Sequence, residues 1–186
     1  MNVWELRCAR INDYATVVPE SEDDLLNGVF DIDGKPLDWR FIPVVKVVDS
    51  RSRGKKTPRP LADVANFGPG TFVLNRRARE ALEPFLGRFG QLLEVQTAGG
   101  AEFRWLYNVT NLVKCVDPAR SETSGSGAIR SEVFYDINLP RTAAVFKDPL
   151  TAAMRMYTND AGKELIERIA ADAGLSGIEC AAPQRF

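Results

Sequence analysis

Carboxylates are the most concentrated chemical groups in the sequence, and they gather near its start. Four fall within five residues and two more follow closely: Glu20, Glu22, Asp23, Asp24, Asp31 and Asp33. A run of this kind is most often a solvated loop, but it also suits an acidic surface that docks on a basic protein. Such charges raise association rates and select partners, so we treat these six side chains as candidate contacts with a protein partner.

The segment Asp31–Lys35 (DIDGK) also resembles the start of a calcium-binding loop. That loop requires a glycine at a fixed internal position and a bidentate glutamate at its end. Neither register, starting at Asp31 or at Asp33, meets these requirements. Asp33-Gly34 is instead a strong turn signal, so we expect a tight loop here and no metal site.

A basic segment follows, and it contains no carboxylate. Its cationic side chains are Arg51, Arg53, Lys55, Lys56 and Arg59. The glycine and prolines among them predict a loop. The ordinary interpretation is a solvated excursion, and the alternative is a module that binds an anionic ligand through loop 51–59. The net charge is −5 over residues 1–50, +6 over 51–90 and −2 over 91–186. The total of −1 argues against direct binding of nucleic acid.

The chain contains no histidine. This excludes Ser-His and Cys-His nucleophile pairs, histidine-dependent metal sites and the usual general base near neutral pH. The glycines of the segment FGPGTF form no nucleotide-binding pattern, so we predict no cofactor. We expect no catalytic residues, although carboxylates or lysine still allow some enzyme chemistry.

Three cysteines, Cys8, Cys115 and Cys180, are odd in number and widely spaced. They predict small buried hydrophobic residues rather than disulfides or a zinc knuckle. The N-terminus lacks the basic and apolar regions of a signal peptide, and no apolar run approaches the roughly 20 residues of a membrane span. We therefore expect a cytoplasmic protein, in which the formal glycosylation acceptor Asn108 is irrelevant.

Hydrophobic periodicity predicts the strands that must position these groups. Residues 3–8 alternate, which indicates a half-buried strand with Trp4, Leu6 and Cys8 inward and Glu5 on the opposite face. Further strands are expected at 41–49, near 72, and at 91–97, 102–117, 132–139, 143–148, 153–159 and 177–183. The acidic connector 19–28 has room for one helical turn.

Two segments have the periodicity of amphipathic helices. The first is 75–90, with Asn75 as its N-cap and Gly90 as its stop. Pro84 should kink it or divide it in two. The second runs from Asn159 or Asp160 to a stop at Gly174.

The tally of eight or nine mostly consecutive strands and two helices favours an α+β fold. We expect a largely antiparallel β-sheet with two main amphipathic helices. The length of 186 residues suits a single domain over 1–186, with 1–60 as a potential N-terminal subregion.

The order of the segments resembles a bacterial immunity-protein family of polymorphic toxin systems, the one numbered eleven, formerly a domain of unknown function. The segments that carry the resemblance are VWELR, FDIDGKPL, a basic loop ending in PLADV, FVLNRRAREALEPFL, GQLLEV, YNVTNLVKCVDPARSE, AAVFKDP and GLSGIE. They cover nearly the whole chain, and their order and spacing together are more specific than any single motif.

The resemblance implies a non-enzymatic role in contact-dependent competition between bacteria: binding and neutralising a cognate toxin that a neighbouring gene encodes. Such toxins are often nucleases, and an acidic surface suits a nuclease because a cleft that holds phosphate is usually basic. Two alternatives stay open. One is a carboxylate- or Lys-dependent enzyme that reverses a toxin modification, and the other is the anionic-ligand module of loop 51–59.

Overall fold

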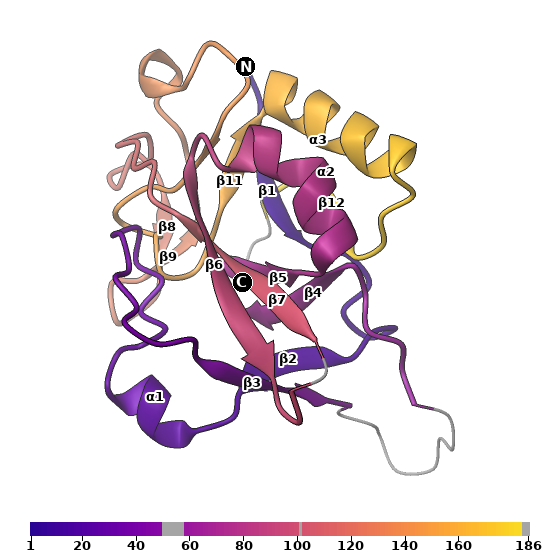
Figure 1. Cartoon of the computed structure of the whole chain (residues 1–186). Helices are drawn as coiled ribbons and strands as arrows, with labels where there is room; N and C mark the ends of the chain where they lie inside the picture. The colour runs from indigo at the N-terminus through magenta and orange to yellow at the C-terminus, as the bar shows by residue number, and fades with distance from the viewer. Residues whose placement is uncertain (50–57, 101, 184–186) are drawn as a thin grey trace.

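The computed structural model describes residues 1–49, 58–100 and 102–183. Twelve strands and three α-helices lie within these ranges, and the strands form two main sheets and a small hairpin (Figure 1). Every strand pair but one is antiparallel, which confirms the predicted α+β class and its largely antiparallel sheet. The expected eight or nine strands were too few, because β2, β4, β8 and β9 lie in segments where no strand was predicted.

The larger sheet has six strands in the order β2-β3-β6-β7-β5-β4. Their bounds are β2 Thr16–Pro19, β3 Val44–Val48, β6 Gly90–Thr97, β7 Phe103–Val109, β5 Thr71–Leu74 and β4 Val64–Gly68. Strands β3 and β6 pair in parallel. The two edge strands β2 and β4 approach each other, and Ala15 N donates to Pro60 O at 3.0 Å beside them. The sheet therefore curls toward a barrel.

The smaller sheet has the order β10-β11-β1-β12. Its strands are β10 Val145–Phe146, β11 Tyr157–Asn159, β1 Val3–Cys8 and β12 Ile178–Ala181. Strand β1 is thus central, with β11 on one side and β12 on the other. A separate hairpin joins β8, Glu122–Thr123, to β9, Ile129–Ser131, and the short 3-10 helix η1 spans Asp136–Asn138.

The six-stranded sheet separates two hydrophobic cores, and strand alternation assigns side chains to them. Val73 of β5 and Leu106 of β7 pack inside the near-barrel. Their neighbours Phe72, Trp105 and Tyr107 pack on the other face, against α2 (Arg76–Leu86) and α3 (Asp160–Asp172). The predicted common face of Trp105, Tyr107 and Val109 is therefore confirmed.

Helices α2 and α3 lie side by side over this second core (Figure 1). The predicted caps are confirmed: the Asn75 side chain accepts from Ala78 N at 2.9 Å, and the Asn159 side chain accepts from Gly162 N at 2.9 Å. Gly174 follows α3 with φ of 60°, the left-handed conformation that glycine adopts readily after a helix.

The end of the first helix was predicted wrongly. Helix α2 stops at Leu86, and Gly90 is the first residue of β6. A Cβ at Gly90 would lie 2.2 Å from Asn108 O on β7, so this glycine allows close strand pairing. Pro84 does not divide the helix, which is continuous over 76–86, because the proline falls in its last turn.

Several strands are shorter than predicted. Strand β7 ends at Val109 rather than at residue 117, because Thr110 N and Asn111 N both turn to Phe89 O. Beyond it, the segment only bridges to Lys147 and Phe134. Residues 132–139 contain η1 instead of a strand, and 153–159 and 143–148 contribute only β11 and β10.

Candidate functional site

Helix α1, Glu22–Leu26, is the helical turn expected in the acidic connector. Ser21 caps it by accepting from Asp23 N at 3.1 Å, and three carboxylates occupy its first turn, where the helix dipole favours negative charge. The helix buries none of its side chains. It lies at the opposite end of the molecule from α2 and α3 (Figure 1). Because α1 packs no side chain into the core, the requirements of core packing do not explain its sequence.

Apolar side chains are exposed on and beside α1. Leu25 is 54% exposed and Leu26 84%, and Phe41 and Ile42, just before β3, are also about half exposed. Two hydrogen bonds bring these segments together: Glu20 N donates to Val44 O at 3.0 Å and Trp39 Nε1 donates to Val29 O at 2.8 Å. A hollow of about 390 Å³ lies between them, lined by Gly28, Val29, Leu37, Asp38, Trp39, Arg40 and Phe41.

We call this surface the α1 face: Glu20, Glu22, Asp23, Asp24, Leu25, Leu26, Phe41, Ile42 and the hollow. Exposed apolar groups surrounded by charged ones are the usual composition of a protein-binding surface. The hollow, which is lined in part by Val29, Leu37, Trp39 and Phe41, can receive an anchoring side chain from a partner. The sequence pattern did not predict the exposed leucines or the hollow, because the segment LLNG is equally typical of a buried segment.

The predicted acidic residues do not all contribute equally. Glu20, Glu22, Asp23 and Asp24 gather at the start of α1, and Asp31 is exposed in the loop beyond it. Asp33 is different, because the Lys35 ammonium forms an ion pair with it. Hydrogen bonding to Lys35 lowers the pKa of the Asp33 carboxyl, and Lys35 N also donates to Asp33 Oδ1 at 3.1 Å. Gly34, with φ of 94°, completes the expected tight loop.

The basic segment is described only at its end. Arg51, Arg53, Lys55 and Lys56 lie outside the described residues. Arg59 is half-buried, and its backbone N donates to Asp49 Oδ2 at 3.1 Å while its guanidinium lies 3.9 Å from Asp49 Oδ1. Arg59 therefore fastens the two ends of this segment, and the binding role of loop 51–59 stays a prediction.

A buried charged cluster lies on the smaller sheet. Arg155 pairs with Glu132, whose other carboxylate oxygen accepts from Tyr157 Oη at 2.9 Å. Glu5 of β1 is only 8% exposed, which corrects its predicted outward position. The groups near Glu5 explain its burial, because it lies close enough to Glu132, in the segment after β9, for its charge to raise the pKa of that carboxyl. Alternation alone gives no signal of this.

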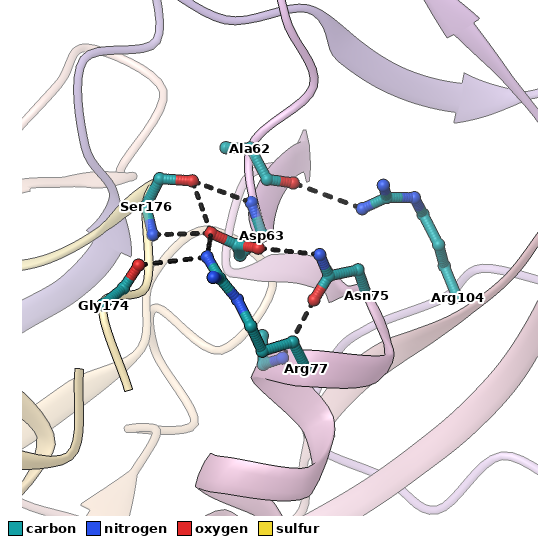
Figure 2. A network of polar contacts seen from close by, with 8 residues as sticks. Ala62, Asp63, Asn75, Arg77, Arg104, Gly174 and Ser176 are labelled. Atoms are coloured by element: carbon teal, nitrogen blue, oxygen red, sulfur yellow. Dashed lines mark hydrogen bonds and ion pairs between the residues drawn. The ribbon is translucent and has the colours of Figure 1, made fainter. Parts of the chain in front are cut away.

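A second polar network joins three distant segments at Asp63 (Figure 2). The Asp63 carboxylate accepts from Asn75 Nδ2 at 2.8 Å, from the Arg77 guanidinium at 2.7 Å, and from Ser176 N and Oγ at 2.8 and 2.7 Å. Arg77 also donates to Gly174 O at 3.0 Å. Burial opposes ionisation of Asp63, but the hydrogen bonds from Arg77, Ser176 and Asn75 outweigh it and hold the pKa of the carboxyl well below its usual range.

The contacts of the Asp63 network are structural. Figure 2 shows the side chains of Asn75 and Arg77, at the start of α2, converging on Asp63 at the start of β4, and Ser176 reaching it from the loop after α3. The carboxylate oxygens are saturated with donors from the protein itself. The network therefore locks the two long helices to the larger sheet rather than presenting a reactive group.

The remaining titratable groups in the interior are also held by the fold. Lys147 is fully buried and donates to Ile32 O at 2.8 Å, and burial lowers its pKa to about 8. Cys115 is buried, as predicted, whereas Cys8 and Cys180 are only half-buried, and all three are free thiols. Burial raises the pKa of each thiol to about 12, which keeps the reactive thiolate scarce at neutral pH.

Asn108, the formal glycosylation acceptor, is completely buried. Its Nδ2 donates to Lys35 O at 2.7 Å and to Gln91 Oε1 at 3.1 Å. The residue therefore joins β7 to β6 and to the loop at Gly34. Its role is to hold the acidic N-terminal segment against the larger sheet.

Comparisons with known proteins give this chain no family: no family model matches it, and no curated protein sequence is similar to it. Over residues 1–49, 58–100 and 102–183, no group of three or more cysteines and carboxylates is arranged to hold a metal ion. The described helices are all too short or too polar to cross a membrane.

Proposed function

We propose that this protein is an immunity protein, which binds a basic toxin through the α1 face and neutralises it as a stoichiometric complex. The observation that carries the proposal is α1 itself: a helix that buries no side chain yet presents three carboxylates and two exposed leucines, with Glu20 just before its cap. The resemblance of the segment order to an immunity-protein family supports the same conclusion. The proposal places the protein in the cytoplasm of the cell that it protects.

The proposed partner is a nuclease or another enzyme with a basic cleft. Carboxylates of the α1 face would stand where such a cleft holds phosphate groups. The leucines would supply the apolar contact that gives a charged interface its stability, because exposed ion pairs alone contribute little. The proposed role is binding without turnover, so no catalytic residue is assigned.

The test is co-expression with the product of the neighbouring toxin-like gene, followed by co-purification and measurement of the dissociation constant. Reversing charges with Glu20→Lys, Glu22→Lys and Asp23→Lys should weaken binding by roughly tenfold or more. A matched control is Glu164→Lys with Asp172→Lys on the exposed side of α3. Equal loss of affinity in both sets, or none in either, contradicts the α1 face as the contact.

The apolar part of the α1 face has a separate test. Leu26→Asp should weaken binding at least tenfold while leaving the folded protein intact, since the side chain is 84% exposed. Ile137, which is 83% exposed in η1, provides the matched control as Ile137→Asp. Unchanged affinity of the Leu26 variant removes the leucine from the interface.

A further inference from the structure

A pocket of about 780 Å³ opens beside β1, away from the α1 face. Its walls come from β1 and the loop after it, from the turn that joins β4 to β5, and from the residues that precede β11. Its volume falls within the range of small-molecule sites in proteins. None of its lining residues belongs to the α1 face, so a ligand bound here would leave that face free.

Glu5 supplies the unusual feature of this pocket. Its neighbours on the adjacent strands are Tyr157 of β11 and Ala181 of β12, and its side chain lines the pocket while being only 8% exposed. In the described part of the chain, the buried Oε2 atom of Glu5 has no hydrogen-bond partner. Leaving a buried carboxylate oxygen unpaired is costly, and folded proteins rarely tolerate it without a functional reason.

Two arginines of the lining, Arg7 and Arg155, are already paired within the protein, whereas Arg10 and Asp13 lie on the loop after β1. Arg7 lies 2.7 Å from the carboxylate of Glu179, and Arg155 pairs with the wholly buried Glu132. Burial raises the pKa of the Glu132 carboxyl despite its bonds to Tyr157 and Arg155, and the charge of Glu5 raises it further. Glu5 and Glu132 are thus neighbouring carboxylates, and the Oε2 atom of Glu5 is a buried acceptor that a positively charged hydrogen-bond donor would satisfy.

The remaining lining is mixed: Asn12, Asn66 and Thr71 are polar, and Leu6, Ile11, Met154 and Met156 are apolar. Leu6 and Met156 are buried at the base of the pocket, and Met154 and Ile11 are more than half exposed at its opening. Apolar side chains beside an unpaired carboxylate oxygen suit a ligand with a cationic head and a short hydrocarbon body. We propose that this pocket binds a small organic cation, an amine or guanidinium compound, whose charged group hydrogen-bonds to Oε2 of Glu5.

The experiment is isothermal titration calorimetry of the whole protein with three cations of different shape: agmatine, cadaverine and benzamidine. N-butylurea, which resembles the guanidinium compound but is neutral, serves as the ligand control. At least one cation should bind and butylurea should bind at least tenfold more weakly. Absence of heat and of thermal stabilisation with all three cations overturns the proposal.

Variants locate the binding. Glu5→Gln keeps the shape of the side chain and should weaken the cation by tenfold to a hundredfold, the usual worth of a charge-assisted hydrogen bond. Asp13→Asn removes the same charge from an exposed position of the same lining and should change affinity by less than about threefold. Equal effects of the two substitutions contradict a site centred on Glu5.

A second test substitutes an exposed residue, so its result does not depend on how well a variant at the buried Glu5 folds. Met154 is 57% exposed at the opening, so Met154→Lys should fold normally. The added cation should weaken binding several-fold by repulsion, whereas Met154→Gln, of similar length but neutral, should not. Identical affinities in the lysine and glutamine variants show that the cation binds elsewhere and overturn the proposal.

Discussion

At the scale of single residues, buried charges fall into two kinds. Asp63 and Lys147 are satisfied by protein groups and hold segments together, whereas Glu5 keeps an unpaired oxygen in a pocket. The difference matters because a buried carboxylate contributes to stability when its oxygens accept hydrogen bonds. A buried carboxylate with an unpaired oxygen lowers stability. Mutation of Asp63 or Lys147 should therefore change the free energy of unfolding, whereas mutation of Glu5 should change the affinity for a ligand.

Asp63→Ala should lower the free energy of unfolding by about 2–4 kcal/mol at pH 7, because it removes the carboxylate that accepts from Asn75, Arg77 and Ser176. The pKa of Asp63 is depressed in the folded state, so its stabilising effect is present above the ordinary carboxyl pKa of about 4 and is lost as the pH falls further. Urea unfolding of the wild type and the variant at pH 7 and pH 3 measures both the loss of stability and its dependence on pH.

The expected result is a deficit of the alanine variant that is large at pH 7 and smaller at pH 3. Asp172→Ala, on an exposed part of α3, is the control and should change stability by less than about 0.5 kcal/mol. A deficit that is the same at both pH values would mean that the charge of Asp63 is irrelevant.

Lys147 should make stability rise with pH. Its folded pKa of about 8 is below the ordinary lysine value of 10.5, so the unfolded state binds more protons between these values. Unfolding free energy should therefore increase by on the order of 2 kcal/mol from pH 8 to pH 10 relative to Lys147→Met. Chemical unfolding of both proteins across this range measures the difference, and parallel profiles would contradict it.

At the scale of elements, the sequence is informative where one local signal decides the structure. Asparagine caps and apolar periodicity located α2 and α3 to within a few residues. Strand parity in β7 was equally predictable, since successive side chains of a strand point to opposite faces. The end of β7 was not, because Thr110 and Asn111 leave the sheet for a bond to Phe89 O that only the fold creates.

The candidate sites were only partly predictable for the same reason. A run of carboxylates is visible in the sequence, so the acidic part of the α1 face was found. Exposure of Leu25 and Leu26 was not visible, because leucine is most often buried. Burial of Glu5 was also hidden, because the groups near it, Glu132 and Arg155, come from more than 120 residues away in the chain.

Gly162 tests how α3 docks on the smaller sheet. A Cβ there would lie 2.1 Å from Thr158 Oγ1 and 2.8 Å from Ala144 O. Gly162→Ala should therefore destabilise the protein by about 1–3 kcal/mol, although glycine to alanine usually stabilises a helix. Gly68→Ala, where a Cβ meets open space, is the control. Thermal unfolding measures the stability of both variants relative to the wild type. A Gly162→Ala protein that is more stable than the wild type would contradict the close packing.

At the scale of the whole molecule, the fold keeps its two candidate surfaces apart. Helices α2 and α3 and the Asp63 network form a rigid side, and α1 lies at the other end of the larger sheet (Figure 1). The N-terminal region is acidic although the net charge of the chain is almost neutral, so the charge is distributed asymmetrically and a partner meets a negative side. Such asymmetry affects how quickly partners meet.

Association with a basic toxin should therefore depend on salt. The association rate should fall by about tenfold or more between 50 mM and 500 mM salt, because the screening length of surface charges shortens from roughly 14 Å to roughly 4 Å over this range. The dissociation rate, which leucine contacts control, should change much less. Stopped-flow or surface-based kinetics measure both rates, and a salt-independent association rate would contradict steering by the acidic residues.

The most direct measurement of the central claim is the mass and stoichiometry of the co-purified pair, together with survival of cells that express the toxin. We predict a stable complex with one copy of each protein, protection of the cells by the wild type, and loss of both with Leu26→Asp combined with Glu22→Lys and Asp23→Lys. Protection without a complex, or a complex that survives these three substitutions, would contradict neutralisation through the α1 face.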